Sequence, residues 1–309
     1  MSNFINIVIV LSFKDNDTDC VFNKRSRKNL LKEFLLLYHS IKKNFKHQHR
    51  INVIHCTDYT DAEQNTLNNL DVDIHRVAYS FPNDDTLKYA CWDKIFSCPF
   101  KVAGTHLLHI DCDTIIFNNP EFNFDCDFQA MYDINQNCYN QKWINYLINR
   151  YNFKNIKLTN KNKNINTEYN LKSSADQKTV DEHNYDRYFP HFNFGCVLMK
   201  NNVASKVYEY YSKFITDHVL WHTRECHVLI QYAVSLALVT ISDNWKLFNY
   251  GINYMGNRYP DSTRVLSADE IFIIHNLSLS FDKCKEVYSE KIKEILSDVP
   301  EDTVQFIME

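Results

Sequence analysis

The sequence predicts an α/β protein with a mostly parallel sheet flanked by helices. In the first part of the chain, short apolar segments of strand length alternate three times with longer segments at helical spacing, a pattern typical of strand–helix–strand units. The first segment, 4–13, is almost continuously apolar, as in a strand that is buried on both faces of a sheet. With 309 residues and 45% hydrophobic residues, the chain can form one large core or two small ones.

The amino-terminal elements follow from the spacing of apolar residues. The helix over 28–45 carries apolar side chains on one side and lysines on the other. Thr60 and Glu63 have the spacing of a capping box, which predicts that a helix begins there. Pro99 ends the third helix. The predicted strands of this part are 4–13, 51–56 and 72–78, and the predicted helices are 28–45, 60–70 and 84–98.

The remaining elements are predicted in the same way. Segment 242–245 reads as a turn, and 282–309 as a carboxyl-terminal helical segment with one amphipathic helix over 282–296. The predicted strands are 107–110, 127–132, 194–199, 238–241 and 271–274, a further short apolar run is 115–117, and the other predicted helices are 140–151, 203–215 and 222–237.

Segment 152–188 differs from the rest in composition. It is dense in Asn, Lys, Asp, Thr and Ser, with few apolar residues and no period. We interpret it as a polar insertion or mobile loop within one domain that spans 1–309. A poorly patterned subdomain is the alternative.

Composition excludes several classes of protein. A net charge of −4 gives no basic field for nucleic acid, and four glycines leave no glycine-rich phosphate loop. The ten cysteines lack zinc spacing and are expected to be reduced. No apolar run approaches a membrane span, and the amino terminus lacks the features of a signal peptide. We therefore expect a cytoplasmic protein; its richness in Asn, Lys and Ile is typical of an AT-rich genome, which suggests a virus-infected host cell.

Asp111 and Asp113 are the residues with the clearest chemistry. They follow the buried strand 107–110, and the apolar run after them ends at Asn118-Asn119-Pro120. Acidic residues at the carboxyl end of a buried strand lie where open α/β sheets bind ligands. Paired carboxylates suit Mg²⁺ or Mn²⁺, although a turn that ends a strand also favours Asp.

Taken together, the motifs resemble those of GT-A glycosyltransferases, particularly glycosyltransferase family 8 and the glycogenin-like group. The resemblance runs from about residue 4 to about 280, in motif order more than in identity. It rests on Tyr89-Ala-Cys-Trp-Asp-Lys94, Leu107-Leu-His-Ile-Asp-Cys-Asp-Thr114 with Asn119-Pro120, Phe192-Asn-Phe-Gly-Cys-Val-Leu-Met199, Asn244-Trp245 and Ile273-Ile274-His275. It implies a Rossmann-like GT-A catalytic domain that transfers a sugar from a nucleotide diphosphate sugar, most readily a uridine diphosphate sugar, to a glycan or another hydroxyl acceptor.

The resemblance also implies the roles of individual residues. Asp111, Asp113 and His275 would hold the metal, and the imidazole shifts the preference from Mg²⁺ towards Mn²⁺. His109 would either pack on the opposite surface or support a carboxylate. The other implied donor-site residues are Lys94 for phosphate or sugar, Ser12 and Phe13 for the nucleotide base, and Asn193 with Gly195 for sugar or acceptor.

The acid that faces the sugar is best matched by Glu225, and Asp243 is its rival. Glu225 would act as a general base in an inverting reaction or as a cation stabiliser in a retaining one; equally, it can be a first-turn helix acid. Trp245, Trp221 and Tyr185 are candidates for stacking on sugar, although aromatic residues are commoner in cores.

The chain departs from the family pattern at two places. Phe194 stands where the family has a small residue, and the glycine and lysine that usually follow the metal histidine are absent. Asn276 or Lys283 could contact the diphosphate instead. Two other functions remain as alternatives: a nucleotidyltransferase or similar phosphate-transfer enzyme, and a non-catalytic carbohydrate- or protein-binding relative. No pattern predicts the oligomeric state.

Overall fold

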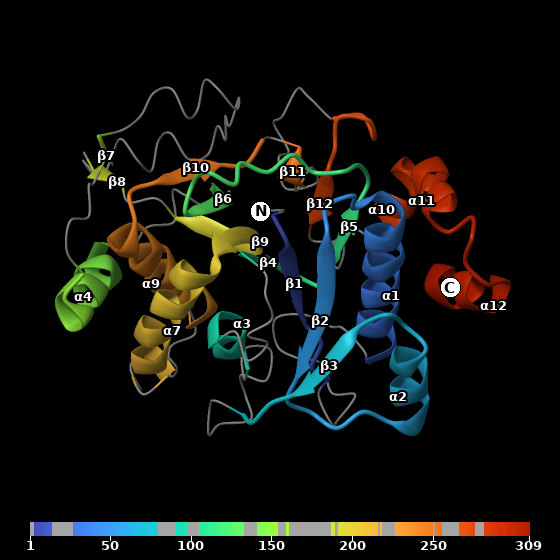
Figure 1. The fold of residues 1–309 in the computed structure, drawn as a ribbon, viewed down its shortest axis with the longest axis horizontal. Helices are drawn as coiled ribbons and strands as arrows, with labels where there is room; N and C mark the ends of the chain where they lie inside the picture. The colour runs from blue at the N-terminus through green and yellow to red at the C-terminus, as the bar shows by residue number, and fades with distance from the viewer. Residues whose placement is uncertain are drawn as a thin grey trace.

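The structure of the chain is a computed structural model. It describes residues 3–13, 27–79, 91–97, 105–132, 141–153, 159–160, 187–188, 191–215, 217, 226–249, 251–254, 266–275 and 281–309. In these ranges the protein has a seven-stranded sheet, a three-stranded sheet and a two-stranded pair, with helices on both sides (Figure 1).

The seven-stranded sheet is mostly parallel, as predicted. Its order is β10-β6-β9-β4-β1-β2-β3, and only β9 runs antiparallel to its neighbours within the described sheet. The strands are β10 (Trp245–Leu247), β6 (Phe128–Tyr132), β9 (Phe192–Lys200), β4 (His106–Ile110), β1 (Ile5–Val10), β2 (His49–His55) and β3 (Asp73–Arg76).

A second, three-stranded sheet lies beside the carboxyl end of β4. Its order is β11 (Ile252–Tyr254), β12 (Ile273–His275) and β5 (Thr114–Ile116), with β12 antiparallel to β5 and parallel to β11. The chain leaves β4 of the large sheet and enters β5 of the small sheet within three residues. This crossing carries the Asp-x-Asp motif.

Two hydrophobic cores cover the two faces of the large sheet. Strand β1 contributes to both, because Ile5, Ile7 and Ile9 join one core and Val8 joins the other. This alternation explains why the first segment is apolar almost throughout.

The helices divide between these cores, and Figure 1 shows the two groups on opposite sides of the sheet. One group is α1 (Arg27–Asn44), α2 (Asp61–Asn68), α10 (Phe281–Val287), α11 (Ser289–Ile295) and α12 (Glu301–Met308). The other group is α3 (Asp93–Ser97), α4 (Gln141–Tyr151), α7 (Asn201–Ile215) and α9 (Cys226–Ile241).

The predicted strand 238–241 is wrong. The segment is the last turn of helix α9, and the backbone N–H of Ser242 still donates to the carbonyl of Leu238 at 3.0 Å. Between Leu229 and Leu238 every side chain except that of Gln231 is buried, so the apolar run has no helical period that would separate it from a strand. The predicted turn 242–245 is shorter than expected, because Trp245 already belongs to β10.

The carboxyl-terminal segment is helical but not one helix. Helix α10 ends at Val287, Tyr288 has a non-helical backbone (φ −115°), and α11 begins at Ser289. After Pro300 a further helix, α12, packs against α1.

Parts of four predicted segments lie outside the described residues, among them residue 140 of the predicted helix 140–151 and residues 222–225 of the predicted helix 222–237. Only the end of the predicted helix 84–98 is described, and it contains α3. Within 152–188, β7 (Thr159–Asn160) pairs with β8 (Arg187–Tyr188) in antiparallel orientation. The interpretation of the remainder as an insertion or mobile loop stays a prediction.

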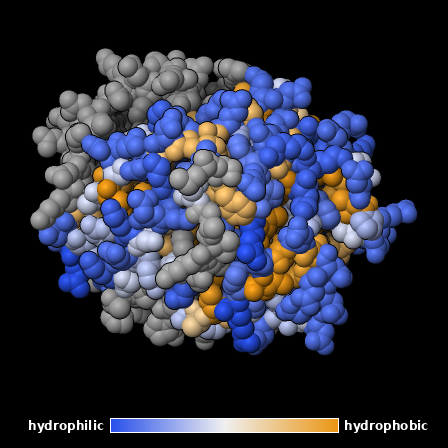
Figure 2. All heavy atoms as spheres, in the orientation of Figure 1, coloured by the Kyte–Doolittle hydropathy of each residue, from blue (hydrophilic) through white to orange (hydrophobic). Residues whose placement is uncertain are grey.

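The surface in the view of Figure 1 is mainly hydrophilic, with hydrophobic side chains gathered beside α1 and β3 (Figure 2). Val72 and Ile74, at this edge of the sheet, are only partly buried. Among the helices that the structure describes, none combines the length and hydropathy needed to cross a bilayer.

Candidate metal and donor site

The backbone fixes the two carboxylates of the Asp-x-Asp motif where the chain changes sheets. The N–H of Asp111 donates to the carbonyl of Gly195 on β9 at 2.9 Å, and the hydroxyl of Thr114 donates to the carbonyl of Asp111 at 2.9 Å. Asp113 is buried and Asp111 is partly exposed. The motif therefore has a defined backbone conformation with both carboxylates at the carboxyl end of β4.

His275 reaches the same point from the other end of the sequence. It is the last residue of β12, where it pairs with Thr114 of β5. Its Nε2 lies 3.5 Å from Oδ2 of Asp111 and 3.6 Å from Oδ1 of Asp113. One ligand atom from each of the three residues lies within 4.8 Å of the others. We call these three residues the acidic triad.

The acidic triad fits a divalent cation. Ligands at about 2.1 Å from one octahedral ion lie about 3 Å apart when adjacent and about 4.2 Å apart when opposite. The observed separations of 3.5 and 3.6 Å fall between these values. The donor set of two carboxylates and one imidazole suits Mn²⁺ and related ions.

His109 supports Asp111 from inside the sheet, which is the second of the two roles expected for it. Its Nε2 lies 3.2 Å from Oδ1 of Asp111, and its Nδ1 lies 3.1 Å from the carbonyl of Val8. Burial alone would raise the pKa of Asp111, but the hydrogen bonds from His109 and His275 hold this pKa well below its ordinary value.

Gly195 makes room for His275. A Cβ at this position would lie 2.0 Å from Cε1, 2.3 Å from Nδ1 and 2.4 Å from Nε2 of the imidazole. The resemblance implies that this glycine leaves space in the donor or acceptor site; in the structure, the ring of His275 fills that space. Only glycine allows the ring to lie against β9.

Asn193 lies two residues before Gly195 on the same strand and is buried. Its Oδ1 accepts hydrogen bonds from the N–H of Gly195 at 2.9 Å and from Nδ2 of Asn253 at 3.0 Å. Asn253 has no place in the sequence prediction. A single Asn between Ile252 and Tyr254 was the available signal, because Asn tolerates left-handed backbone better than most residues.

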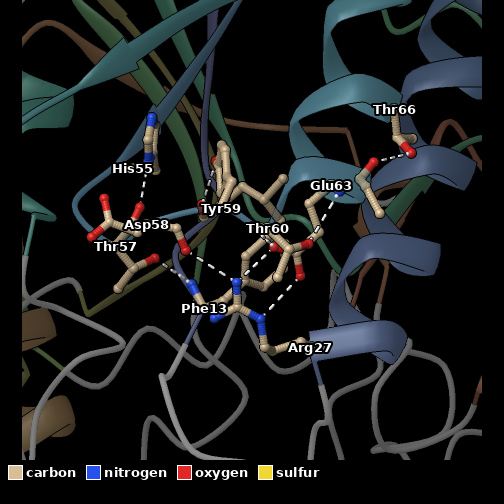
Figure 3. Close-up of polar contacts among 11 residues, drawn as sticks. Phe13, Arg27, His55, Thr57, Asp58, Tyr59, Thr60, Glu63 and Thr66 are labelled. Atoms are coloured by element: carbon tan, nitrogen blue, oxygen red, sulfur yellow. Dashed lines mark hydrogen bonds and ion pairs between the residues drawn. The ribbon is translucent and has the colours of Figure 1, made fainter.

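Ser12 and Phe13 follow the carboxyl end of β1, which is parallel to β4, so they lie at the same end of the sheet as the acidic triad. Figure 3 shows Phe13 with Tyr59 and Arg27. The hydroxyl of Ser12 accepts from the N–H of Cys56 at 3.1 Å. The Phe13 ring packs edge-on against Tyr59 at 5.3 Å, and the Arg27 guanidinium lies 4.8 Å from its centroid. At the predicted base-binding end, the Phe13 ring is thus packed between Tyr59 and Arg27; we call these three residues the aromatic wall.

Glu63 holds that wall in place. It accepts from Nε and Nη2 of Arg27 at 3.0 and 2.6 Å and from the N–H of Thr60 at 2.8 Å (Figure 3). The predicted capping box at Thr60 is present.

The structure places Asp243 and Trp245 away from the acidic triad. Trp245 of β10 pairs with Phe128 of β6, and Phe128 pairs with Met199 of β9. Met199 in turn pairs with Leu107 of β4, which lies four residues before Asp111. Asp243 precedes Trp245 by two residues and so lies towards the amino end of these parallel strands, whereas Asp111 follows the carboxyl end of β4. Trp245 packs on Phe128 at 5.9 Å. The structure therefore does not bring either residue next to the acidic triad.

Of the remaining candidates, the structure describes Lys94. Nζ of Lys94 lies 3.0 Å from Oδ2 of Asp93; burial alone would lower the pKa of Lys94, but Asp93 raises it. Outside the described residues lie Glu225, Trp221, Tyr185 and Asn276, and the side chain of Lys283 is not described either.

Comparison with known proteins identifies the fold. No protein-family model and no curated protein matches the sequence. A structure of an active-site mutant of LgtC matches with a TM-score of 0.50 and 12% identity, over 97% of this chain and 99% of that chain. The bifunctional glycosyltransferase WbbM matches with a TM-score of 0.50 and 11% identity, over all of this chain and 52% of WbbM, so this chain spans about half of that protein. A second LgtC structure, of a galactosyltransferase in complex with donor and acceptor sugar analogues, matches with a TM-score of 0.46 and 11% identity, over 97% and 99% of the two chains. On the two matches with a TM-score of 0.50, the chain has the GT-A fold of glycosyltransferases.

Proposed function

We propose that this protein is a metal-dependent glycosyltransferase that transfers a sugar from a nucleotide diphosphate sugar to a hydroxyl acceptor. The observation that carries the proposal is the acidic triad at the carboxyl end of a central strand in a GT-A fold. We prefer a uridine diphosphate sugar as donor and a glycan as acceptor, on the strength of the family resemblance.

The chain's own residues would divide the work. Asp111, Asp113 and His275 would hold Mn²⁺, which neutralises the charge that builds on the departing diphosphate. His109 would orient Asp111, as outer residues do around bound metals. Ser12 and Phe13 would receive the base. Glu225 remains the proposed acid facing the sugar, and Lys94 a proposed phosphate contact.

The test is a thermal-shift panel of UDP, GDP, UDP-glucose, UDP-galactose and GDP-mannose, each with and without Mn²⁺. A ligand at a hundred times its dissociation constant stabilises the native state by about 2.7 kcal/mol. We expect one nucleotide series to raise the melting temperature only when Mn²⁺ is present.

Asp113→Ala should remove this response, because it removes one metal ligand. The matched control is Asp125→Ala, which changes an exposed aspartate before β6 at the other edge of the sheet. The control should keep the full response. The proposal would be overturned if the folded wild-type protein showed no change in melting temperature with any of the five ligands in the presence of Mn²⁺.

Product analysis then separates the alternatives. Release of the nucleoside diphosphate with transfer of the sugar supports a glycosyltransferase, whereas release of pyrophosphate or of a nucleoside monophosphate indicates a nucleotidyltransferase or another phosphate-transfer enzyme. Binding without turnover in any acceptor mixture, and without donor hydrolysis, indicates a binding-only relative.

A further inference from the structure

Asn253 combines three unfavourable features in one buried residue. Its φ is 63°, in the left-handed region, and it is 1% exposed. The pairing of β11 with β12 is irregular around it, since Ile252 pairs with Ile273 and Tyr254 with Ile274. Its Oδ1 is buried and has no hydrogen-bond partner among the described residues. Strain and irregular pairing of this kind gather next to functional sites, where they aim a side chain.

The orientation of the Asn253 amide is fixed by its neighbour. The N–H of Gly195 can only donate, so the Asn193 atom that it contacts must be the oxygen. That oxygen also contacts the Asn253 amide, so the Asn253 atom facing it must be the NH₂ group. The carbonyl oxygen of Asn253 is therefore the atom left over, and a flipped amide would place two oxygens together.

The Asn253 amide lies close to the acidic triad. Oδ1 of Asn193 lies 2.9 Å from the backbone nitrogen of Gly195. The ring of His275 lies directly on Gly195. The Asn193–Asn253 pair is thus bonded to the residue that the imidazole packs against.

Oδ1 of Asn253, which has no hydrogen-bond partner among the described residues, determines what kind of group can bind to it. A carbonyl oxygen accepts hydrogen bonds, so it cannot bind a phosphate oxygen, which is also an acceptor. It can bind a hydroxyl group. The base end of the site lies at β1 and β2, and the acidic triad would hold the diphosphate, which leaves the hydroxyl groups of the transferred sugar for a residue beyond the triad.

We propose that Asn253 recognises the donor sugar, with its Oδ1 accepting a hydrogen bond from a hydroxyl group of that sugar. Asn193 holds the Asn253 amide in this orientation. The inference rests on the proposed function and adds a specificity-determining residue to it.

Asn253→Gly tests the role of the side chain with little change to the backbone, because glycine adopts a positive φ freely. Calorimetry with Mn²⁺ measures the dissociation constants of UDP-glucose, UDP-galactose and UDP, and of GDP-mannose and GDP. The deciding quantity is the ratio of nucleotide-sugar affinity to nucleoside-diphosphate affinity. For the accepted sugar we expect this ratio to fall about tenfold in Asn253→Gly, the effect of one lost hydrogen bond to a buried group.

Each outcome has one meaning. An equal loss for nucleotide sugar and nucleoside diphosphate would show a merely structural role and overturn the inference, as would an unchanged ratio. Failure of wild-type protein to bind any of the five ligands with Mn²⁺ would overturn the proposed function instead. If Asn253→Gly does not fold, nucleotide sugars that lack single hydroxyl groups carry the test on wild-type protein. The inference is overturned if the loss of each single hydroxyl group weakens binding by about twofold or less.

Discussion

Replacing Gly195 with alanine should displace His275 from the acidic triad. The new Cβ would lie 2.0 to 2.4 Å from three ring atoms of the imidazole. Carbon atoms in normal contact are about 3.5 Å apart or more, so the ring must move by about 1.5 Å. That movement is much larger than the tolerance of about 0.2 Å in a metal–ligand distance, so Nε2 would leave its place between the two carboxylates.

The magnitude follows from what metal sites lose when a ligand is misplaced. Changes outside the ligand shell already cost about 10- to 100-fold in metal affinity, so Gly195→Ala should cost at least about 100-fold. This corresponds to about 2.7 kcal/mol. The assay is a calorimetric titration of the protein with Mn²⁺, with the melting temperature of the metal-free protein measured alongside.

Gly251→Ala is the matched control. A Cβ there would lie 2.2 Å from the carbonyl oxygen of Glu270 and 2.8 Å from a ring carbon of Phe272. Both substitutions should therefore lower the melting temperature, but only Gly195→Ala should weaken Mn²⁺ binding more than tenfold. The double variant Gly195→Ala/His275→Ala removes the clash and should recover stability without recovering metal affinity. Wild-type Mn²⁺ affinity in Gly195→Ala would refute the reasoning.

Two further predictions concern stability. Burial alone would raise the pKa of Glu63, but hydrogen bonds from Arg27 and from the N–H of Thr60 lower this pKa overall. The ionised carboxylate therefore stabilises the folded protein above the unfolded pKa of about 4.3. This stabilisation is lost as the pH falls through the folded pKa. Glu63→Gln should thus destabilise the protein by about 1 kcal/mol at pH 7 and by less at pH 4 in urea unfolding; an equal loss at both pH values would contradict this. Asp217 accepts hydrogen bonds from Tyr146 at 2.8 Å and Tyr151 at 2.6 Å, so Asp217→Ala should cost about 3 kcal/mol in the same assay and Tyr146→Phe about 1. Similar values for the two variants would show that the carboxylate does not join the two tyrosines.

The sequence predicts the fold well where burial of one or both faces of an element gives a recognisable spacing of apolar residues. Strands at the centre of the sheet are apolar on both faces and lie close to their predicted positions. Helix α1 also lies close to its predicted position, but it is buried more widely than its apolar side predicts, because Lys32 and Glu33 are buried too. Helix α9 is apolar along nearly its whole length and leaves no helical period, which is why its last turn is predicted as a strand. The break at Tyr288 depends on how α10 and α11 pack, and the local sequence does not encode it.

The site divides in the same way. Asp111 and Asp113 are adjacent in sequence and follow a recognisable strand, so a pattern finds them. His275 was placed through the family resemblance, because nothing local distinguishes a strand-end histidine from a ligand. The roles of Gly195 and Asn253 depend on contacts between β9, β11 and β12, which no sequence spacing reveals.

The crossing between the two sheets has a consequence during protein synthesis. His275 is translated about 160 residues after Asp113, which takes roughly 10 to 30 s at cellular rates of elongation. Throughout that interval the nascent chain has two aspartates without their histidine, and β5 has no β12 to pair with. The apolar edge formed by Thr114, Ile115 and Ile116 then resembles an unprotected sheet edge, which other chains can join. Completion of the acidic triad therefore coincides with closure of this edge, and a ribosome that stalls before β12 would release a chain prone to aggregate.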